Sequence, residues 1–280
     1  MIPCLFVSDL HGHLERYERL THAIEKERPR AVLLGGDLLP GLAGQGDFLA
    51  DVLTPRLERL RSRLGNAYPK IFVILGNDDG RVPEAEFLEL SARGLCTYLH
   101  DRRSTIDQFP VFGYAYVPPT PFLLKDWERY DVSRYVDPGC VSPEHGQYSV
   151  AVSERERRNG TIAADLERLT DGEDLSRAVL LFHAPPYRTK LDRAALDGKA
   201  VDHAPLDVHI GSIAIRRFIE QRQPWLSLHG HVHEAPRLSG AWMDTLGRSI
   251  LITAAHDGPE LALVRFDLER PQDATRELIR

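Results

Sequence analysis

Cysteine is scarce in this sequence, and long apolar runs are missing from it. Cys4, Cys96 and Cys140 form an odd, widely spaced set without a C-x-x-C pair, which argues against a cysteine zinc or redox site. No stretch approaches the roughly 18 apolar residues of a membrane span. The opening apolar run, residues 2–7, meets charged residues too early to be the core of a signal peptide. We expect a cytoplasmic protein in a reducing compartment, with no membrane association.

A strong charge of one sign is also missing. The formal net charge is −6 and acidic and basic residues are mixed along the chain, so bulk electrostatic binding to long nucleic acids is not expected. Hydrophobic residues make up 42% of the 280 positions, which is enough for a buried core. Because compact α/β folds reach this length as one unit, we predict a single domain over residues 1–280.

Three common catalytic motifs are absent. The sequence has no G-x-S-x-G elbow, no P-loop G-x-x-x-x-G-K-(S/T) and no G-x-G-x-x-G after a predicted strand. The chemistry must therefore come from other residues.

The first third of the chain alternates short apolar runs with amphipathic segments, the pattern of a sheet wound with helices through βαβ crossovers. The pattern predicts strands at 2–7, 31–34, 70–75, 95–99 and 104–114. It predicts helices at 14–28, 47–64 and 83–92.

Regular patterning is lost after residue 114 and returns later. Residues 115–150 are rich in proline and aromatics, and we predict an ordered insertion or lid at about 115–175 rather than a linker. Helices are expected at 153–169 and 213–221, and strands at 178–182, 225–228, 250–253 and 261–266.

Five polar clusters follow predicted strands. They are Asp9-Leu10-His11, Gly35-Gly36-Asp37, Gly76-Asn77-Asp78-Asp79, His183 and Gly230-His231-Val232-His233. In open α/β sheets ligands bind in the crevice beyond the carboxyl ends of the strands, so these clusters should converge. Carboxylate and amide oxygens mixed with imidazoles are a donor set for manganese, iron, zinc or similar ions.

These clusters, in this order, resemble the calcineurin-like metallophosphoesterases, whose pattern is D-x-H, G-D, G-N-H-(D/E), H, G-H-x-H. The resemblance covers roughly residues 2–235, with the insertion outside it. It implies a four-layer α/β/β/α sandwich. It also implies two metal sites that share one bridging carboxylate, that of Asp37. One site would use Asp9, His11, Asp37 and His233, and the other Asp37, Asn77, His183 and His231.

The resemblance implies two divalent or trivalent transition-metal ions as cofactors. Manganese is expected, with iron, zinc, cobalt and nickel as alternatives, because such sites accept several ions. Two ions about 3.5 to 4 Å apart acidify a bridging water to a hydroxide that attacks phosphorus in line. No protein nucleophile is then required.

One position departs from the family pattern. Asp78 stands where the family usually has a histidine that is thought to protonate the leaving group or steady the transition state. A carboxyl group with a reference pKa of about 3.9 is ionised at neutral pH and is a poor general acid. It would also repel a phosphate dianion. We therefore expect the hydrolysis of a phosphodiester or pyrophosphate in a small molecule.

Several side chains near the clusters have competing interpretations. Asp78 could contact substrate or support the turn, and His13 could touch substrate phosphate or be a solvated or capping residue. Asp79 is expected to orient its loop, and His229 to be a buried structural histidine. For the aromatic residues of the insertion, internal packing is favoured over a rim that stacks on a flat substrate group. They are Tyr114, Tyr116, Phe122, Trp127, Tyr130 and Tyr135.

Other functions stay open at this stage. The enzymatic alternatives are a phosphomonoesterase, including a phosphoprotein phosphatase, and a nuclease, for which the acidic balance makes long nucleic acid a poor substrate. A catalytically silent interaction scaffold is the alternative outside enzymes, although a scaffold need not keep seven metal-binding side chains. Substrate choice is expected to depend on the insertion and on the loop at residues 41–46.

Overall fold

Two six-stranded sheets lie face to face in the computed structural model, which describes all residues 1–280. The first sheet has the order β14 (Arg270–Ile279), β13 (Leu261–Asp267), β1 (Pro3–Val7), β2 (Ala31–Gly35), β3 (Lys70–Ile74) and β4 (Thr97–Tyr98). The second has the order β11 (Met243–Leu246), β12 (Ser249–Thr253), β10 (Leu226–His229), β7 (Val179–Phe182), β6 (Phe109–Tyr114) and β5 (Arg102–Ile106).

Both sheets have a run of parallel strands, with antiparallel pairing on one side of the first sheet and at both edges of the second. Strands β1, β2, β3 and β4 run parallel, and β13 pairs antiparallel with β1. Strands β6, β7, β10 and β12 are likewise parallel, with β5 and β11 antiparallel at the edges. The carboxyl ends of the parallel strands therefore meet at one end of each sheet.

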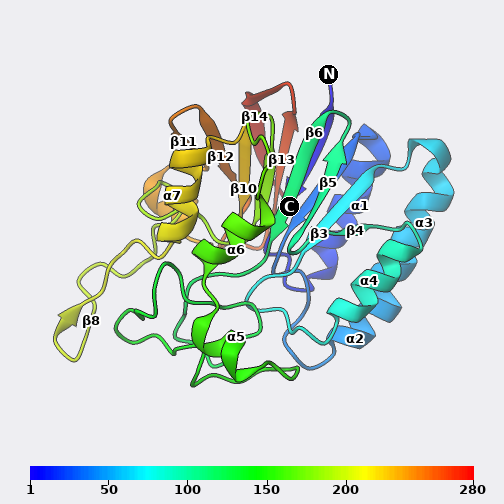
Figure 1. Ribbon diagram of the computed structural model, residues 1–280. Helices are drawn as coiled ribbons and strands as arrows, with labels where there is room; N and C mark the ends of the chain where they lie inside the picture. The colour runs from blue at the N-terminus through cyan, green and yellow to red at the C-terminus, as the bar shows by residue number, and fades with distance from the viewer.

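Helices cover the outer faces of the two sheets (Figure 1). The first sheet is covered by α1 (Leu14–Glu27), α3 (Thr54–Leu64) and α4 (Glu84–Ala92), and the second by α6 (Ile162–Leu169) and α7 (Ile213–Arg222). This arrangement confirms the predicted four-layer α/β/β/α sandwich. No helix of the structure combines the length and the apolar character that crossing a bilayer requires.

The strands are apolar on both faces because each sheet is covered on both sides. In β1, Phe6 points into the core between the sheets, where it joins Phe72 and Leu181. The next residue, Val7, belongs to the cluster under the helices, with Tyr17 of α1. Alternation of this kind follows from the two-residue period of a strand.

The predicted helix at 47–64 is three consecutive pieces. These are α2 (Gln45–Phe48), a π-helical turn (Leu49–Leu53) and α3, followed by a short 3-10 turn (Gly65–Ala67). Pro55 lies in the first turn of α3. Because proline has no amide hydrogen to donate, the chain loses little hydrogen bonding when the turn before it is π-helical rather than α-helical.

Two predicted elements are each split in the structure. The strand predicted at 104–114 is the hairpin β5–β6, which turns at Asp107 with a φ of 51°. Aspartate tolerates this left-handed conformation and favours turns. The helix predicted at 153–169 is α5 (Glu154–Asn159) followed by α6, because Gly160 ends one helix and Thr161 caps the next.

Short or exposed elements escaped the sequence patterns. They are the small hairpin β8 (Ala200–Val201) and β9 (Ala204–Pro205), the helix α8 (Ala235–Ser239), and the edge strands β11 and β14. The strand expected at 95–99 shortens to β4.

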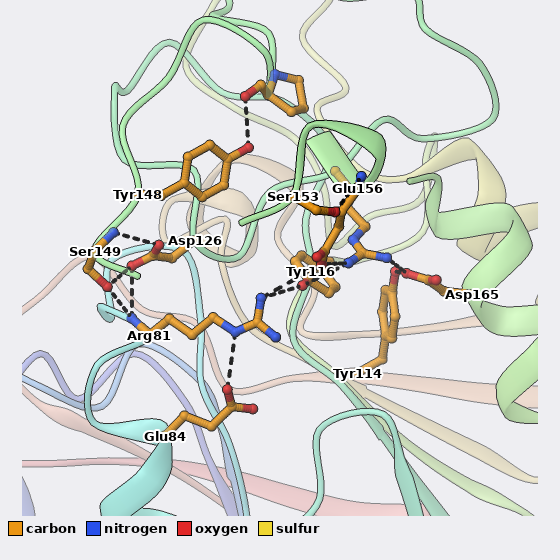
Figure 2. A network of polar contacts seen from close by, with 12 residues as sticks. Arg81, Glu84, Tyr114, Tyr116, Asp126, Tyr148, Ser149, Ser153, Glu156 and Asp165 are labelled. Atoms are coloured by element: carbon orange, nitrogen blue, oxygen red, sulfur yellow. Dashed lines mark hydrogen bonds and ion pairs between the residues drawn. The ribbon is translucent and has the colours of Figure 1, made fainter. Parts of the chain in front are cut away.

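Residues 115–150, the irregular part of the predicted insertion, are held by polar contacts rather than by helices or strands. Arg81, just before α4, donates hydrogen bonds to Glu84 and Tyr116, and its backbone amide donates to Asp126 at 2.8 Å (Figure 2). Arg129 lies over the Tyr116 ring, donates to Asp165 of α6 and pairs with Glu156 of α5. The insertion is thereby fixed to both helical layers.

Candidate metal centre

The five polar clusters converge at the carboxyl ends of the parallel strands. Asp9 follows β1, Asp37 follows β2 and Asn77 follows β3, all in the first sheet. His183 directly follows β7 and His231 follows β10, both in the second sheet. The site therefore joins the ends of the two sheets.

Two groups of donor atoms form there, with all donors of each group within 4.8 Å of one another. The first contains Asp9, His11, Asp37 and His233, and the second contains Asp37, His183 and His231. The Asn77 side-chain oxygen lies 3.2 Å from Nε2 of His183, which places it beside the second group. The structure thus brings together the two sets that the family resemblance implies, with Asp37 in both.

Donor atoms face one another at short distances inside these groups. Nε2 of His233 lies 3.1 Å from Nε2 of His11 and 3.3 Å from Oδ1 of Asp9. Nε2 of His183 lies 3.2 Å from Oδ2 of Asp37. Converging oxygen and imidazole nitrogen atoms of this kind suit a borderline or hard transition-metal ion.

Four of the candidate ligands have a left-handed backbone. The φ angles are 57° at Asp9, 47° at His11, 52° at Asp37 and 74° at His231. In a non-glycine residue this conformation raises the free energy of the folded chain by on the order of 1–3 kcal/mol, so it is kept only where the surrounding structure imposes it. Backbone hydrogen bonds impose it here, from Asp9 to Gly36 at 2.9 Å and from His11 to Asp37 at 2.8 Å. Four of the eleven non-glycine residues with a positive φ therefore lie among the candidate ligands.

Glycine is required where the strand ends crowd together. A Cβ at Gly76 would lie 2.3 Å from Oδ1 of Asp37 and 2.6 Å from Nε2 of His183. A Cβ at Gly36, whose φ is 94°, would lie 2.5 Å from Nδ1 of His183. These glycines leave the donor atoms free to converge.

Hydrogen bonds orient the candidate ligands. Nδ1 of His183 bonds the Gly35 carbonyl at 2.7 Å, which directs Nε2 into the site. The backbone amide of Asp78 donates to Oδ1 of Asp37 at 2.9 Å, and that of His231 donates to Oδ1 of Asp9 at 3.0 Å.

The carboxylates draw positive charge into this buried site. Burial disfavours charge on His183, but the Asp37 and Asp9 carboxylates outweigh it and raise the pKa of His183 to about 10. Burial likewise opposes charge on His233, and Asp9 raises its pKa to about 9. Burial lowers the pKa of His231 to about 3, which keeps that imidazole neutral and able to act as a ligand.

Asp79 and His229 are both fully buried beside the site. Asp79 accepts backbone hydrogen bonds from Leu38, Leu39 and Gly76 at 3.1, 2.8 and 2.9 Å, so it holds two of the site loops together. His229 bonds the Ala184 carbonyl through Nδ1 at 2.8 Å and belongs to neither donor group.

Asp78 and His13 lie at the exposed margin. Oδ2 of Asp78 is 3.7 Å from Nδ1 of His11, and the Asp78 side chain also accepts a hydrogen bond from Asn77 at 2.9 Å. His13 is exposed at the N-cap of α1 and makes no capping hydrogen bond. His256 pairs with Glu260 at 3.1 Å and belongs to neither donor group.

Sequence reasoning missed the supporting role of Arg16. This residue of α1 carries a buried guanidinium that donates to the Asp9 carbonyl and to the Gly258 carbonyl, each at 2.6 Å. It thereby joins the first cluster to the loop before β13. Nothing in its sequence neighbourhood separates it from the solvated arginines of other helices.

Beside the donor groups lies a cavity of about 270 Å³. Its polar side is formed by His11, Asn77 and Asp78. Its other side chains are apolar: Leu39, Leu42, Phe122 and Leu124. A larger cavity of about 360 Å³ lies beside Arg81 and Arg129, away from the donor groups, and most of its charged side chains pair with one another.

Residues 2–235 match the family model for calcineurin-like phosphoesterases. This chain belongs to the calcineurin-like phosphoesterase family. The match takes in all five clusters and confirms the resemblance seen in the sequence. The activity of this family is the metal-dependent hydrolysis of phosphoesters, and the two donor groups supply candidate ligands for the metal.

Solved structures share the fold at low sequence identity. One crystal structure has a TM-score of 0.62 at 16% identity, covering 100% of this chain and 99% of its own. The protein TT1561 of Thermus thermophilus has a TM-score of 0.55 at 19% identity, covering 99% of both chains. A dimetal phosphatase from Danio rerio has a TM-score of 0.53 at 13% identity, covering 94% of this chain and 91% of its own. Among curated proteins, no match to this sequence was found.

Proposed function

We propose that this calcineurin-like phosphoesterase uses two metal ions to hydrolyse a phosphodiester or pyrophosphate bond of a small molecule. The observation that carries the two-metal part is the Asp37 carboxylate, which belongs to both donor groups. The observation that favours a diester is Asp78, a carboxylate at the mouth of the site where the family has an imidazole.

The donor set fits two transition-metal ions. One ion would be held by Asp9, His11, Asp37 and His233, and the other by Asp37, Asn77, His183 and His231. Manganese is the proposed metal, because oxygen donors and imidazoles both suit it. Bound ions would activate water and neutralise charge on the phosphoryl group.

Asp78 selects against the most highly charged substrates. Its side chain is 48% exposed and lines the cavity next to Asn77, so it faces an incoming phosphate group. Without metal ions, burial and the Asp37 carboxylate raise the pKa of Asp78, and two neighbouring cations would reverse that direction. The ionised carboxylate repels a monoester dianion more than a diester monoanion. His13, exposed two residues after His11, is the proposed contact for a more distant substrate oxygen.

The test compares bis(p-nitrophenyl) phosphate with p-nitrophenyl phosphate as substrates of metal-stripped protein to which Mn²⁺ is returned. We expect a higher kcat/KM for the diester, and a fall of about 100-fold or more in Asp37→Ala, which loses a donor from both groups. Asp78→His should raise the monoester-to-diester ratio, because it removes the repulsive carboxylate and adds a proton donor.

The alternatives give different results in the same experiment. A higher kcat/KM for the monoester would overturn the argument from Asp78 and favour a phosphomonoesterase or phosphoprotein phosphatase. Protein that binds no transition-metal ion in elemental analysis after Mn²⁺ loading and desalting would contradict every enzymatic proposal. The catalytically silent interaction scaffold would then be the remaining alternative.

A further inference from the structure

The cavity beside the donor groups has an apolar wall built from two loops that are distant in sequence. Leu39 and Leu42 come from the loop after β2, whereas Phe122 and Leu124 come from the insertion. The same cavity is lined by His11 and Asn77, two candidate metal ligands. A phosphate group held at the metal centre would therefore have an ester substituent within reach of this wall.

Two residues of the wall are unusually exposed for their type. Phe122 is 61% exposed and Leu42 is 55% exposed, while Leu39 behind them is buried. Single exposed apolar side chains are common on protein surfaces. These two meet in one cavity with further apolar side chains and with the candidate ligands, which is the composition of a small-molecule site.

The insertion loop that carries Phe122 is rigidly supported. The Glu128 carboxylate accepts hydrogen bonds from the backbone amide and the hydroxyl of Thr120, and it pairs with the fully buried Lys125. Gln147 closes the loop by donating to the Leu123 carbonyl at 2.7 Å and accepting from the Lys125 amide at 2.8 Å. A preformed loop binds a ligand without the entropy cost of ordering it.

The loop that carries Leu42 is tied to the third polar cluster. The Gln45 side chain donates to the Pro40 carbonyl at 2.9 Å and accepts from the Gly80 amide at 2.8 Å. The Leu39 amide donates to Asp79. The loop of Leu42 is therefore fixed relative to the donor groups.

The cavity contains no lysine or arginine. Its ionisable side chains are Asp78 and the candidate ligand His11. A substituent with additional phosphate or carboxylate groups would meet the Asp78 carboxylate and apolar carbon atoms, with no cation to pair with it. The occupant that fits is uncharged.

We propose that Phe122 and Leu42 form a specificity subsite for an uncharged apolar or aromatic ester group of the substrate. This inference rests on the proposed function, because it requires the phosphate group to bind at the metal centre. It corrects part of the sequence expectation for the aromatic residues. Tyr114, Tyr116, Trp127 and Tyr130 are buried and pack internally, whereas Phe122 faces the cavity.

The test measures binding rather than turnover. Isothermal titration of Mn²⁺-loaded protein with methylphosphonate and phenylphosphonate compares two probes with the same phosphonate group and different substituents. We expect phenylphosphonate to bind about tenfold more tightly, from burial of its ring against the apolar wall. Phe122→Ala should reduce this ratio to about twofold, and Leu42→Ala should reduce it to an intermediate value.

Leu123→Ala is the matched control. Leu123 is 55% exposed in the same loop but does not line the cavity, so its substitution should leave the ratio of the two affinities unchanged. Equal affinities of the wild-type protein for the two probes would overturn the subsite. A ratio that survives both Phe122→Ala and Leu42→Ala, with native thermal unfolding of the variants, would overturn it as well.

The titration separates this proposal from the proposed function. The affinity ratio of the two phosphonates could change in the variants as expected while p-nitrophenyl phosphate is the better substrate. In that case the subsite is supported and the proposed preference for diesters is wrong. If neither phosphonate binds protein in which elemental analysis finds Mn²⁺, the subsite is overturned and the metal centre stands. If the protein retains no Mn²⁺, both fail together.

Discussion

At Gly76 a single missing side chain decides whether the candidate ligands can converge. The position sits between Asp37, which both donor groups share, and His183 of the opposite sheet. A methyl group there would overlap donor atoms of both residues, so one of them would have to move out of the site.

We expect Gly76→Ala to weaken Mn²⁺ binding by about tenfold or more, as loss of support to metal ligands does. The measurement is titration of metal-stripped protein with Mn²⁺, followed by elemental analysis. Gly46→Ala is the control, because its Cβ would meet no atom closer than 3.7 Å. Unchanged Mn²⁺ affinity in Gly76→Ala would contradict the assignment of Asp37 and His183.

Most of the candidate ligands could be predicted from sequence because each follows an apolar strand in a short polar cluster. Asp9 and Asp37 are examples, since the end of a buried strand is visible in the pattern. The supporting residues were harder to predict. Arg16 acts on backbone carbonyls of two distant segments, and no local pattern encodes those distances.

Among the elements, α5 and α6 differ in what their caps stabilise. The Thr161 side chain accepts a hydrogen bond from the Ala164 amide at 3.2 Å and begins a helix that buries Ile162 and Leu166. The Ser153 side chain accepts from the Glu156 amide at 3.1 Å and begins a helix that buries no residue. The two caps therefore have similar hydrogen bonds, but only the helix that Thr161 caps packs side chains into the core.

Thr161→Ala should lower the free energy of unfolding by about 1 kcal/mol, the usual cost of losing a cap. Ser153→Ala should lower it by less than about 0.5 kcal/mol, because α5 can fray without opening the core. Urea unfolding followed by circular dichroism measures both values. Equal losses, or a larger loss in Ser153→Ala, would contradict this account.

The break between these helices shows what the apolar period misses. The residues of 153–169 are compatible with one charged helix, and Gly160 alone does not forbid it. The capping hydrogen bond of Thr161 and the docking of Asp165 on Tyr114 and Arg129 favour a new helix there. Tertiary contacts overrode the local pattern.

Across the whole molecule, the candidate metal centre joins the two sheets. Asp9, Asp37 and Asn77 come from the first sheet, and His183 and His231 come from the second. Because these residues meet only in the folded chain, metal ions held by them would bind the folded state and not the unfolded one. Binding is then coupled to folding.

Removal of metal should lower the thermal midpoint of unfolding. A ligand at 100 times its Kd stabilises the folded state by about 2.7 kcal/mol per site, which corresponds to a shift of about 5 °C or more for a chain of this length. Calorimetry of chelator-treated protein, before and after Mn²⁺ is returned, measures the shift. In Asp37→Ala the shift should largely disappear. A thermal midpoint of the wild-type protein that does not change when Mn²⁺ is returned would contradict a metal site shared by the two sheets.

The four-layer class was implied by the resemblance to the metallophosphoesterases, whereas the pattern of residues alone indicated the central parallel strands and the order of the polar clusters. It could do so because a buried strand is apolar along its length and its end is marked by polar residues within a few positions. The cytoplasmic location, the single domain and the metal identity stay predictions from the sequence.

The tertiary structure decided the features that depend on segments far apart in the chain. Leu42 and Phe122 have no relation in sequence, yet they share one cavity because Gln45, Asp79 and the Lys125–Glu128 pair fix their loops. The left-handed backbone at Asp9 and Asp37 likewise follows from hydrogen bonds between neighbouring strand ends. Local patterns record which residues are apolar or polar, whereas the distances between loops are set by packing.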